Sequence, residues 1–306
     1  MRPSAFMVLA AFVSLFSCAK HAATGIAVDS AFRAFIPPDT KVLAGLRADQ
    51  LKTSPLYKRH QKQLQIPLLD AFAERVGFDP RRDLSDLLVA WNGKQPVFLA
   101  RGGITQAELE QRLSSFGAQR AAYRKYTLFG TPNESLFFAK KNVAVAGPAE
   151  ALRHTIDIHE DGSGGVPDEL QQRLEALPKY DQVWAVSRQG LPFADVPMRS
   201  DIGSALSNIV AFVTGASVGI GLDTGAHLQM EITCISDQGA QRVRDALRGG
   251  IGLARLTTKD NEPDMLRLYD SIHVDQDQQL IHVRADLSAD LADKLLARLP
   301  QLHSLP

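Results

Sequence analysis

The thiol of Cys18 is the side chain whose position indicates the clearest chemistry, because it directly follows an N-terminal export signal. Arg2 gives the chain a cationic start, and the run from Ala5 to Phe16 is twelve residues of mainly apolar character. A helix that spans a membrane needs about 20 residues, so this run has the length of a signal-peptide core. We therefore predict that residues 1–17 form a signal peptide that is removed from the mature protein.

The tetrad Leu15-Phe16-Ser17-Cys18 resembles the lipobox of bacterial lipoproteins, in which Leu and two small residues precede the modified Cys. Phe16 departs from this pattern because it is bulky. The resemblance implies that Cys18 carries a thioether-linked diacylglycerol and an amide-linked acyl chain, and several acyl chains anchor a protein stably. In that family an Asp after the Cys favours the inner membrane, so Ala19 implies the outer membrane, facing the periplasm. Cleavage at the small residues after Cys18 is the alternative, and it would release the protein from the membrane.

The segment 215–221 contains a Gly-x-Ser-x-Gly spacing around Ser217, which is the pattern of a hydrolase nucleophile elbow. Its glycines also resemble a phosphate-binding loop. Both motifs require a helix directly after the glycines, whereas apolar residues here alternate up to Leu222, as in a strand. We therefore expect small residues within a bent strand. A Ser-dependent hydrolase, with Asp223 and His227 downstream, stays as an alternative that requires His227 within hydrogen-bond reach of Ser217.

The densest group of possible metal ligands lies between His154 and Asp161. His154 and His159 are five residues apart, which places them off a shared helical face, and no zinc-protease motif occurs in the chain. We predict a solvated helix end here and no metal or other cofactor. Cys234, the second of two cysteines, lies on the apolar face of an alternating strand, and we expect it to be buried and unreactive.

The charge balance argues against two classes of partner. The chain has 34 basic and 34 acidic residues and no basic block. Nucleic-acid binding and electrostatic attraction to anionic lipid both depend on clustered basic residues, so neither is expected. Hydrophobic residues make up 45% of the chain, which is enough for an ordinary packed core.

The pattern of elements predicts an α+β fold made of two similar modules. After the signal peptide, residues 18–36 read as a tether, although Phe32, Phe35 and Ile36 are candidates for a short docked helix. The first module covers residues 37–165 and the second covers residues 166–306. Each is expected to be an antiparallel sheet with helices packed on one face, and the two sheets are expected to join edge to edge.

The prediction of two modules depends on recurring local signals. The predicted strands at 42–47 and 183–188 both end in Arg, and each is followed by a helical stretch and a hairpin. Asn92-Gly93 is a strong hairpin signal in the first half. Thr105 and Glu108 have capping-box spacing at the start of a predicted helix. We infer a duplication from this order, with a chance likeness between two mixed α+β segments as the alternative.

The start of the mature region resembles a group of uncharacterised exported bacterial proteins. The resemblance rests on Pro-Pro-Asp-Thr at 37–40 and on Gly-Phe-Asp-Pro with a following Asp-Leu at 77–84. It implies a shared fold and export from the cytosol, and it implies no activity.

Taken together, these features predict a non-enzymatic, lipid-anchored protein of the cell envelope that acts as a binding protein or scaffold. Its expected partner is another envelope protein, cell-wall material or a ligand. The first alternative is a periplasmic carrier of an apolar ligand or lipid, held in a cavity lined by Leu, Val and Phe. The second alternative is the Ser217 hydrolase.

Overall fold

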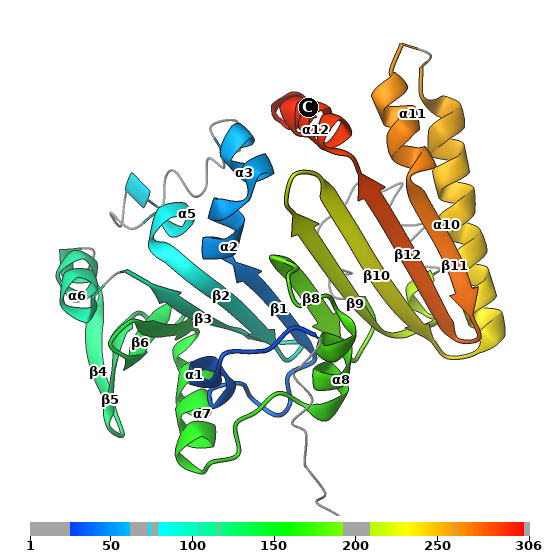
Figure 1. The fold of residues 1–306 in the computed structure, drawn as a ribbon. Coiled ribbons are helices and arrows are strands. Elements are labelled where there is room, and N and C mark those ends of the chain that lie inside the picture. The colour runs from blue at the N-terminus through cyan, green and yellow to red at the C-terminus, as the bar shows by residue number, and fades with distance from the viewer. Residues whose placement is uncertain are drawn as a thin grey trace, which may run out of the picture.

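A computed structural model describes residues 25–61, 73–74, 79–103, 105–115, 117–191, 209–259 and 261–302. Within them, all strands belong to one antiparallel sheet (Figure 1). The strands are β1 (Val42–Arg47), β2 (Leu84–Trp91), β3 (Pro96–Gly102), β4 (Gln119–Tyr123), β5 (Tyr126–Gly130), β6 (Ser135–Lys140), β7 (Val143–Gly147), β8 (Val183–Ser187), β9 (Val213–Leu222), β10 (Ala226–Cys234), β11 (Ile272–Asp277) and β12 (Leu280–Leu287). The α+β class is therefore confirmed.

The strands of the two predicted modules join edge to edge in a single sheet, as predicted. Its strand order is β11-β12-β10-β9-β8-β1-β2-β3-β7-β6-β5-β4, and β1 and β8 pair at its centre. Leu43 lies opposite Val186 in that pairing, so the ladder is continuous across the expected boundary at residue 166. Strands from both halves thus form one 12-stranded sheet, and the duplication stays a prediction.

The helices cover opposite faces of this sheet in its two halves. They are α1 (Ser30–Arg33), α2 (Ala48–Thr53), α3 (Pro55–His60), α5 (Pro80–Asp83), α6 (Gln106–Ser115), α7 (Ala149–Glu160), α8 (Asp168–Ala176), α10 (Asp237–Thr257), α11 (Pro263–Asp270) and α12 (Ala289–Leu302). Val186 packs with α7 and α8 in one buried cluster, whereas Ala216 packs with α10 in another. Val186 lies opposite Ser217, the neighbour of Ala216, and successive residues of a strand point to opposite faces. The predicted second module, residues 166–306, therefore has α8 on one face and α10 on the other, so helices on a single face do not describe it.

The segment from Gly25 to Ile36 belongs to the packed body, which corrects the prediction of a tether over residues 18–36. Ile26 is 1% exposed, and its N–H donates a hydrogen bond of 2.9 Å to the carbonyl of Leu174 in α8. Phe32, Phe35 and Ile36 are buried in the same cluster as α7 and α8. Apolar side chains at this spacing are more stable against the sheet than in water. The predicted signal peptide, Cys18 and the start of the tether lie outside the described residues.

Two local predictions are confirmed, and three elements were missed. Asn92 Oδ1 accepts hydrogen bonds of 3.0 Å from the N–H groups of Lys94 and Gln95 in the β2–β3 hairpin. The N–H of Thr105 donates to Glu108 Oε2 at 3.1 Å, and the N–H of Glu108 donates to Thr105 Oγ1 at 3.3 Å, which is a capping box. The sequence patterns did not predict α5, β4 or α11. The helix expected near residues 200–209 falls mostly outside the described residues.

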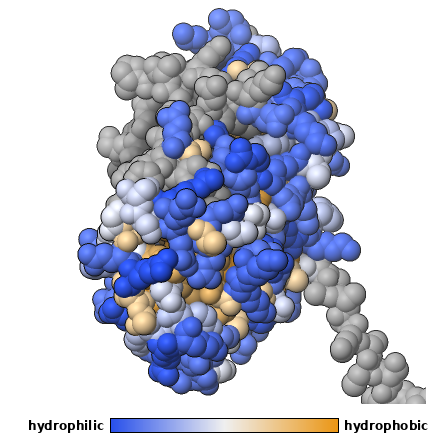
Figure 2. All heavy atoms as spheres, turned by 90° about the vertical axis from the view of Figure 1, so that its left-hand side faces the viewer, coloured by the Kyte–Doolittle hydropathy of each residue, from blue (hydrophilic) through white to orange (hydrophobic). Residues whose placement is uncertain are grey.

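The edge strands of the sheet are β4 and β11. The side of the molecule that carries β4 is mainly hydrophilic, with small hydrophobic areas between the polar side chains (Figure 2). At the other edge, Arg248 of α10 donates from Nε to the carbonyl of Val274 in β11 at 2.9 Å. This contact covers one of the backbone acceptors that an edge strand leaves open for pairing.

None of the helices within the described ranges has the length and apolar character needed to cross a membrane.

Candidate functional site

Three glycines of β9 share the sheet face opposite α10, and each lies against a polar side chain. A Cβ atom added at Gly215 would lie 2.6 Å from Arg173 Nη2. At Gly219 it would lie 2.0 Å from Asp181 Oδ2, and at Gly221 it would lie 1.8 Å from a ring carbon of His227. These distances are too short for any real Cβ, so the glycines make room for the three polar groups. The predicted strand with small residues is confirmed, and its glycines do not precede a helix.

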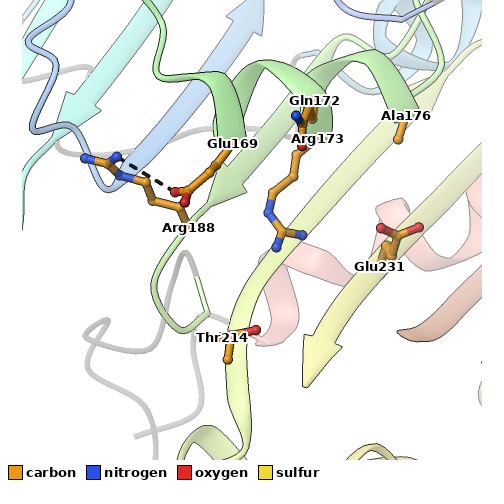
Figure 3. Close-up of a pocket in the computed structure, with 7 residues that line it drawn as sticks. All are labelled: Glu169, Gln172, Arg173, Ala176, Arg188, Thr214 and Glu231. Atoms are coloured by element: carbon orange, nitrogen blue, oxygen red, sulfur yellow. Dashed lines mark ion pairs between the residues drawn. The ribbon is translucent and has the colours of Figure 1, made fainter. Parts of the chain in front are cut away.

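A pocket with a volume of about 380 Å³ lies where α8 meets β9 and β10. Figure 3 shows the guanidinium of Arg173 reaching down from α8 toward Thr214, with Glu231 on the wall formed by β10. Arg188 and Glu169 lie on the opposite side. We call this cavity the Arg173 pocket.

Arg173 is the half-buried charge of this pocket. Its Nη1 donates a hydrogen bond of 2.9 Å to Thr233 Oγ1. Burial lowers the pKa of the guanidinium, and the more distant charges of Glu231 and Glu169 act in the opposite direction. Among the described residues no carboxylate lies within 4.0 Å of Arg173. A partly desolvated cation without a close counter-ion is an unfavourable arrangement that a bound anion would relieve.

The two acids of the Arg173 pocket each have another nitrogen-bearing neighbour. Glu169 Oε2 lies 3.8 Å from Arg188 Nη1, and Arg188 Nη2 also donates to the carbonyl of Pro38 at 3.0 Å. Glu231 Oε2 lies 3.6 Å from the ring nitrogen of His282 on β12. Of the charged groups that line the pocket, the guanidinium of Arg173 is therefore the one available to pair with a bound anion. A guanidinium binds carboxylate or phosphate through parallel N–H donors, so these are the groups that fit.

A second polar contact on the same face joins Asp181 and His227. Asp181 is fully buried, and its Oδ1 lies 2.6 Å from His227 Nε2. Burial raises the pKa of Asp181, and the hydrogen bond from His227 opposes that shift. Within the described part of the chain, Asp181 Oδ2 has no hydrogen-bond partner. This pair is a buried polar contact that fixes the start of β10 against the segment before β8.

The hydrolase alternative requires an arrangement that the structure does not contain. Ser217 lies opposite Glu231, whereas His227 lies opposite Gly221, four residues further along β9. At about 3.4 Å per residue this separation is roughly 14 Å, far beyond hydrogen-bond reach. Ser217 is also only 1% exposed and lies in the middle of a strand. Ser217 and His227 therefore do not form a nucleophile and base pair.

The residues considered as metal ligands take part in other contacts. Asp157 accepts a hydrogen bond of 2.8 Å from the Tyr123 hydroxyl and lies 2.6 Å from Arg124 Nε. Glu160 lies 2.7 Å from Lys125 Nζ, and the ring of His159 stacks on Phe35 with centroids 4.1 Å apart. No cluster of three or more such ligands is found in the part of the chain that the structure describes.

Cys234 is 1% exposed in β10, as predicted. Burial raises the pKa of its thiol, which disfavours the reactive thiolate.

No protein-family model matches the chain, and no curated protein matches it. Among solved structures, it is similar to TP0453 of Treponema pallidum. Crystal form III of that protein gives a TM-score of 0.51 at 9% identity, over 90% of this chain and 99% of the other. Crystal form I gives 0.47 at 8% identity, over 90% and 98%. At this identity the similarity concerns the fold alone, which two chains of comparable extent share.

Proposed function

We propose that the protein is a non-enzymatic, lipid-anchored binding protein of the cell envelope. The signal-like residues 1–17 and the lipobox-like tetrad ending at Cys18 support export and anchoring. Ala19 after the modified Cys favours the outer membrane, with the body in the periplasm. The described residues begin at Gly25, so residues 18–24 lie between them and the lipid. At 3.3–3.6 Å per residue such a segment reaches at most about 25 Å, which holds the body close to the membrane surface.

We propose further that the Arg173 pocket is the binding site, and that it receives an acidic group of an envelope protein or of cell-wall material. The observation that carries this proposal is the half-buried guanidinium of Arg173, which has no carboxylate within 4.0 Å in the described chain. A carboxylate or phosphate from a partner would supply the missing counter-charge. Thr233 already fixes one edge of the guanidinium through Nη1, which leaves the other donors oriented for a ligand.

The carrier alternative finds less support than the binding protein. A cavity for an apolar ligand is lined mainly by apolar side chains with few polar groups. The Arg173 pocket is instead lined by four charged residues together with Gln172 and Thr214. The interior between the sheet and α7 and α8 is filled, with Leu152 and Leu174 among its fully buried side chains.

The binding site is tested by titrating the purified soluble body, beginning at residue 19, with acetate and with inorganic phosphate while amide resonances of β9 and α8 are followed by NMR. We expect saturable shifts around Gly215, and an apparent affinity about tenfold weaker or worse in Arg173→Gln, because a charge-assisted hydrogen bond is lost. Arg244→Gln is the matched control, since Arg244 lies on α10 and pairs with Asp245 at 2.7 Å. Equal binding by Arg173→Gln and wild type, or no response to either anion, would exclude this site.

A further inference from the structure

A second pocket, with a volume of about 200 Å³, lies at the end of β1 and β2 that faces the segment before α1. We propose that it binds a small neutral molecule through two groups, the indole N–H of Trp184 and the carboxylate of Asp86. The ligand class is a molecule whose hydroxyl or amide both accepts and donates a hydrogen bond. The proposal is independent of the Arg173 pocket and of the lipid anchor.

Trp184 supplies a buried donor at this pocket. It lies opposite Gly45 in the pairing of β8 with β1, and both residues line the pocket. A Cβ at Gly45 would lie 2.2 Å from Cζ2 and 2.8 Å from Nε1 of Trp184, so the nitrogen-bearing edge of the indole lies over this glycine. Trp184 is 4% exposed, and its Nε1 has no hydrogen-bond partner among the described residues. Buried indole N–H groups normally have a partner, so this donor points to a ligand.

Asp86 supplies an acceptor at the same pocket. It lies opposite Arg47 on the neighbouring strand, and its side chain is partly buried. Arg47 donates to the carbonyl of Lys179 and makes no ion pair with Asp86 within 4.0 Å. Arg101, on the other side of Asp86, is paired with Asp29 at 2.7 Å. The carboxylate of Asp86 therefore keeps its lone pairs for another donor.

The charges around the pocket favour a neutral ligand. Arg47 and Arg101 carry two positive charges, and Asp86 and Asp29 carry two negative charges. Asp49 also acts on Asp86 but is paired with Lys52 at 2.8 Å, so the group is balanced. An added ammonium or carboxylate would leave one partly buried charge without a counter-ion, which is costly at low dielectric. A hydroxyl or an amide can accept from an N–H and donate to a carboxylate without bringing a net charge.

The size of the pocket limits the ligand to a few atoms. A volume of about 200 Å³ corresponds to roughly six or seven water-sized volumes of about 30 Å³ each. Phe32 and Leu88 line the pocket beside the polar groups and give an apolar wall to a short carbon chain. A molecule of the size of glycerol or acetamide, or one hydroxyl-bearing unit of a larger compound, fits these limits.

The experiment follows the two indole N–H resonances of the protein labelled with ¹⁵N-tryptophan. The chain has only two tryptophans, so Trp91, which does not line the pocket, is an internal control. Glycerol and acetamide are the neutral probes, and acetate and methylammonium are charged probes of similar size. We expect at least one neutral probe to shift the Trp184 resonance saturably while Trp91 stays unchanged. An unmoved Trp184 resonance with both neutral probes, or equal shifts with the charged probes, would overturn the proposal.

Two variants assign the binding groups. Trp184→Phe keeps an aromatic ring and removes the N–H, and Asp86→Leu keeps the approximate size and removes the acceptor. Each should weaken the apparent affinity about five- to tenfold, as read from the amide resonance of Gly45, because one hydrogen bond is lost. Trp91→Phe should bind like wild type. Unchanged affinity in both pocket variants would refute the assignment of Trp184 and Asp86 as the binding groups. If either variant does not fold, the titration of wild type with the four probes tests the proposal.

Discussion

Replacing Gly219 with Ala should destabilise the protein, because the added methyl group would overlap with the buried carboxylate of Asp181. The Cβ would lie 2.0 Å from Asp181 Oδ2 and 3.2 Å from a methyl carbon of Leu177. Both neighbours are buried, with exposures of 0% and 2%, so neither can move into solvent without shifting the chain around it. Overpacking of this kind costs about 1–3 kcal/mol.

The carboxylate of Asp181 cannot retreat without stretching its 2.6 Å contact with His227. Loss of that hydrogen bond adds roughly 1–2 kcal/mol, because the acceptor is a buried carboxyl group while the His227 side chain is 31% exposed. The expected loss in the free energy of unfolding is therefore about 2–5 kcal/mol. For a chain of this size that loss lowers Tm by at least about 4 °C.

Urea unfolding followed by circular dichroism measures this loss, with Gly249→Ala as the matched control. Gly249 lies within α10 and has no atom within 4 Å of an added Cβ. Alanine is a better helix former than glycine, so the control should gain about 0.5–1 kcal/mol. If Gly219→Ala is as stable as wild type, the glycine does not make room for Asp181, and our description of this face of β9 is wrong.

Two other substitutions test the same face and the sheet edge. The urea midpoint of Asp181→Asn should rise relative to that of wild type as the pH rises from about 4 to 7. Burial raises the folded-state pKa of Asp181, so the wild-type protein loses stability as the pH rises through that value. If the urea midpoint of Asp181→Asn falls or stays constant relative to wild type over this pH range, the pKa of Asp181 is not raised by folding. Arg248→Ala should uncover the carbonyl of Val274 on edge strand β11 and increase self-association in sedimentation velocity. Arg244→Ala is its control, and identical sedimentation of the two variants would show that Arg248 does not protect this edge.

Local signals in the sequence predicted an element correctly where one short-range interaction determines the backbone conformation. The Asn92 side chain bonds to its own turn, and Thr105 and Glu108 cap each other, so both features are encoded within four residues. The alternation of apolar residues with small or polar residues after Gly215 likewise predicted strand β9 instead of a phosphate-binding loop or a nucleophile elbow.

The arrangement of the elements depended on contacts that short patterns do not contain. The pairing of β1 with β8 joins residues about 140 positions apart, and although an edge-to-edge join was predicted, no short pattern indicated which strands make it. The segment 25–36 was grouped with a tether because it follows small and polar residues, yet its own Ile26 and Phe32 are buried against helices from later in the chain.

The Arg173 pocket was also missed, because its groups come from separate elements. The sequence placed Arg173 in a predicted helix but gave no sign that Gly215 leaves room for its guanidinium. The sequence did contain one signal for the pocket, because Gly215, Gly219 and Gly221 share one face of the predicted strand. Such a stripe indicates that something polar or bulky packs on that face.

Mass spectrometry of the mature N-terminus, on protein extracted from membranes, decides whether the chain is anchored as proposed. The N-terminal peptide of wild type should begin at Cys18 and carry the mass of a diacylglycerol with an additional acyl chain. Cys18→Ala should lack this mass and leave the membrane fraction. A wild-type chain that begins at Met1, or at an unmodified residue after Cys18, would contradict the lipid anchor and with it the assignment to the cell envelope membrane.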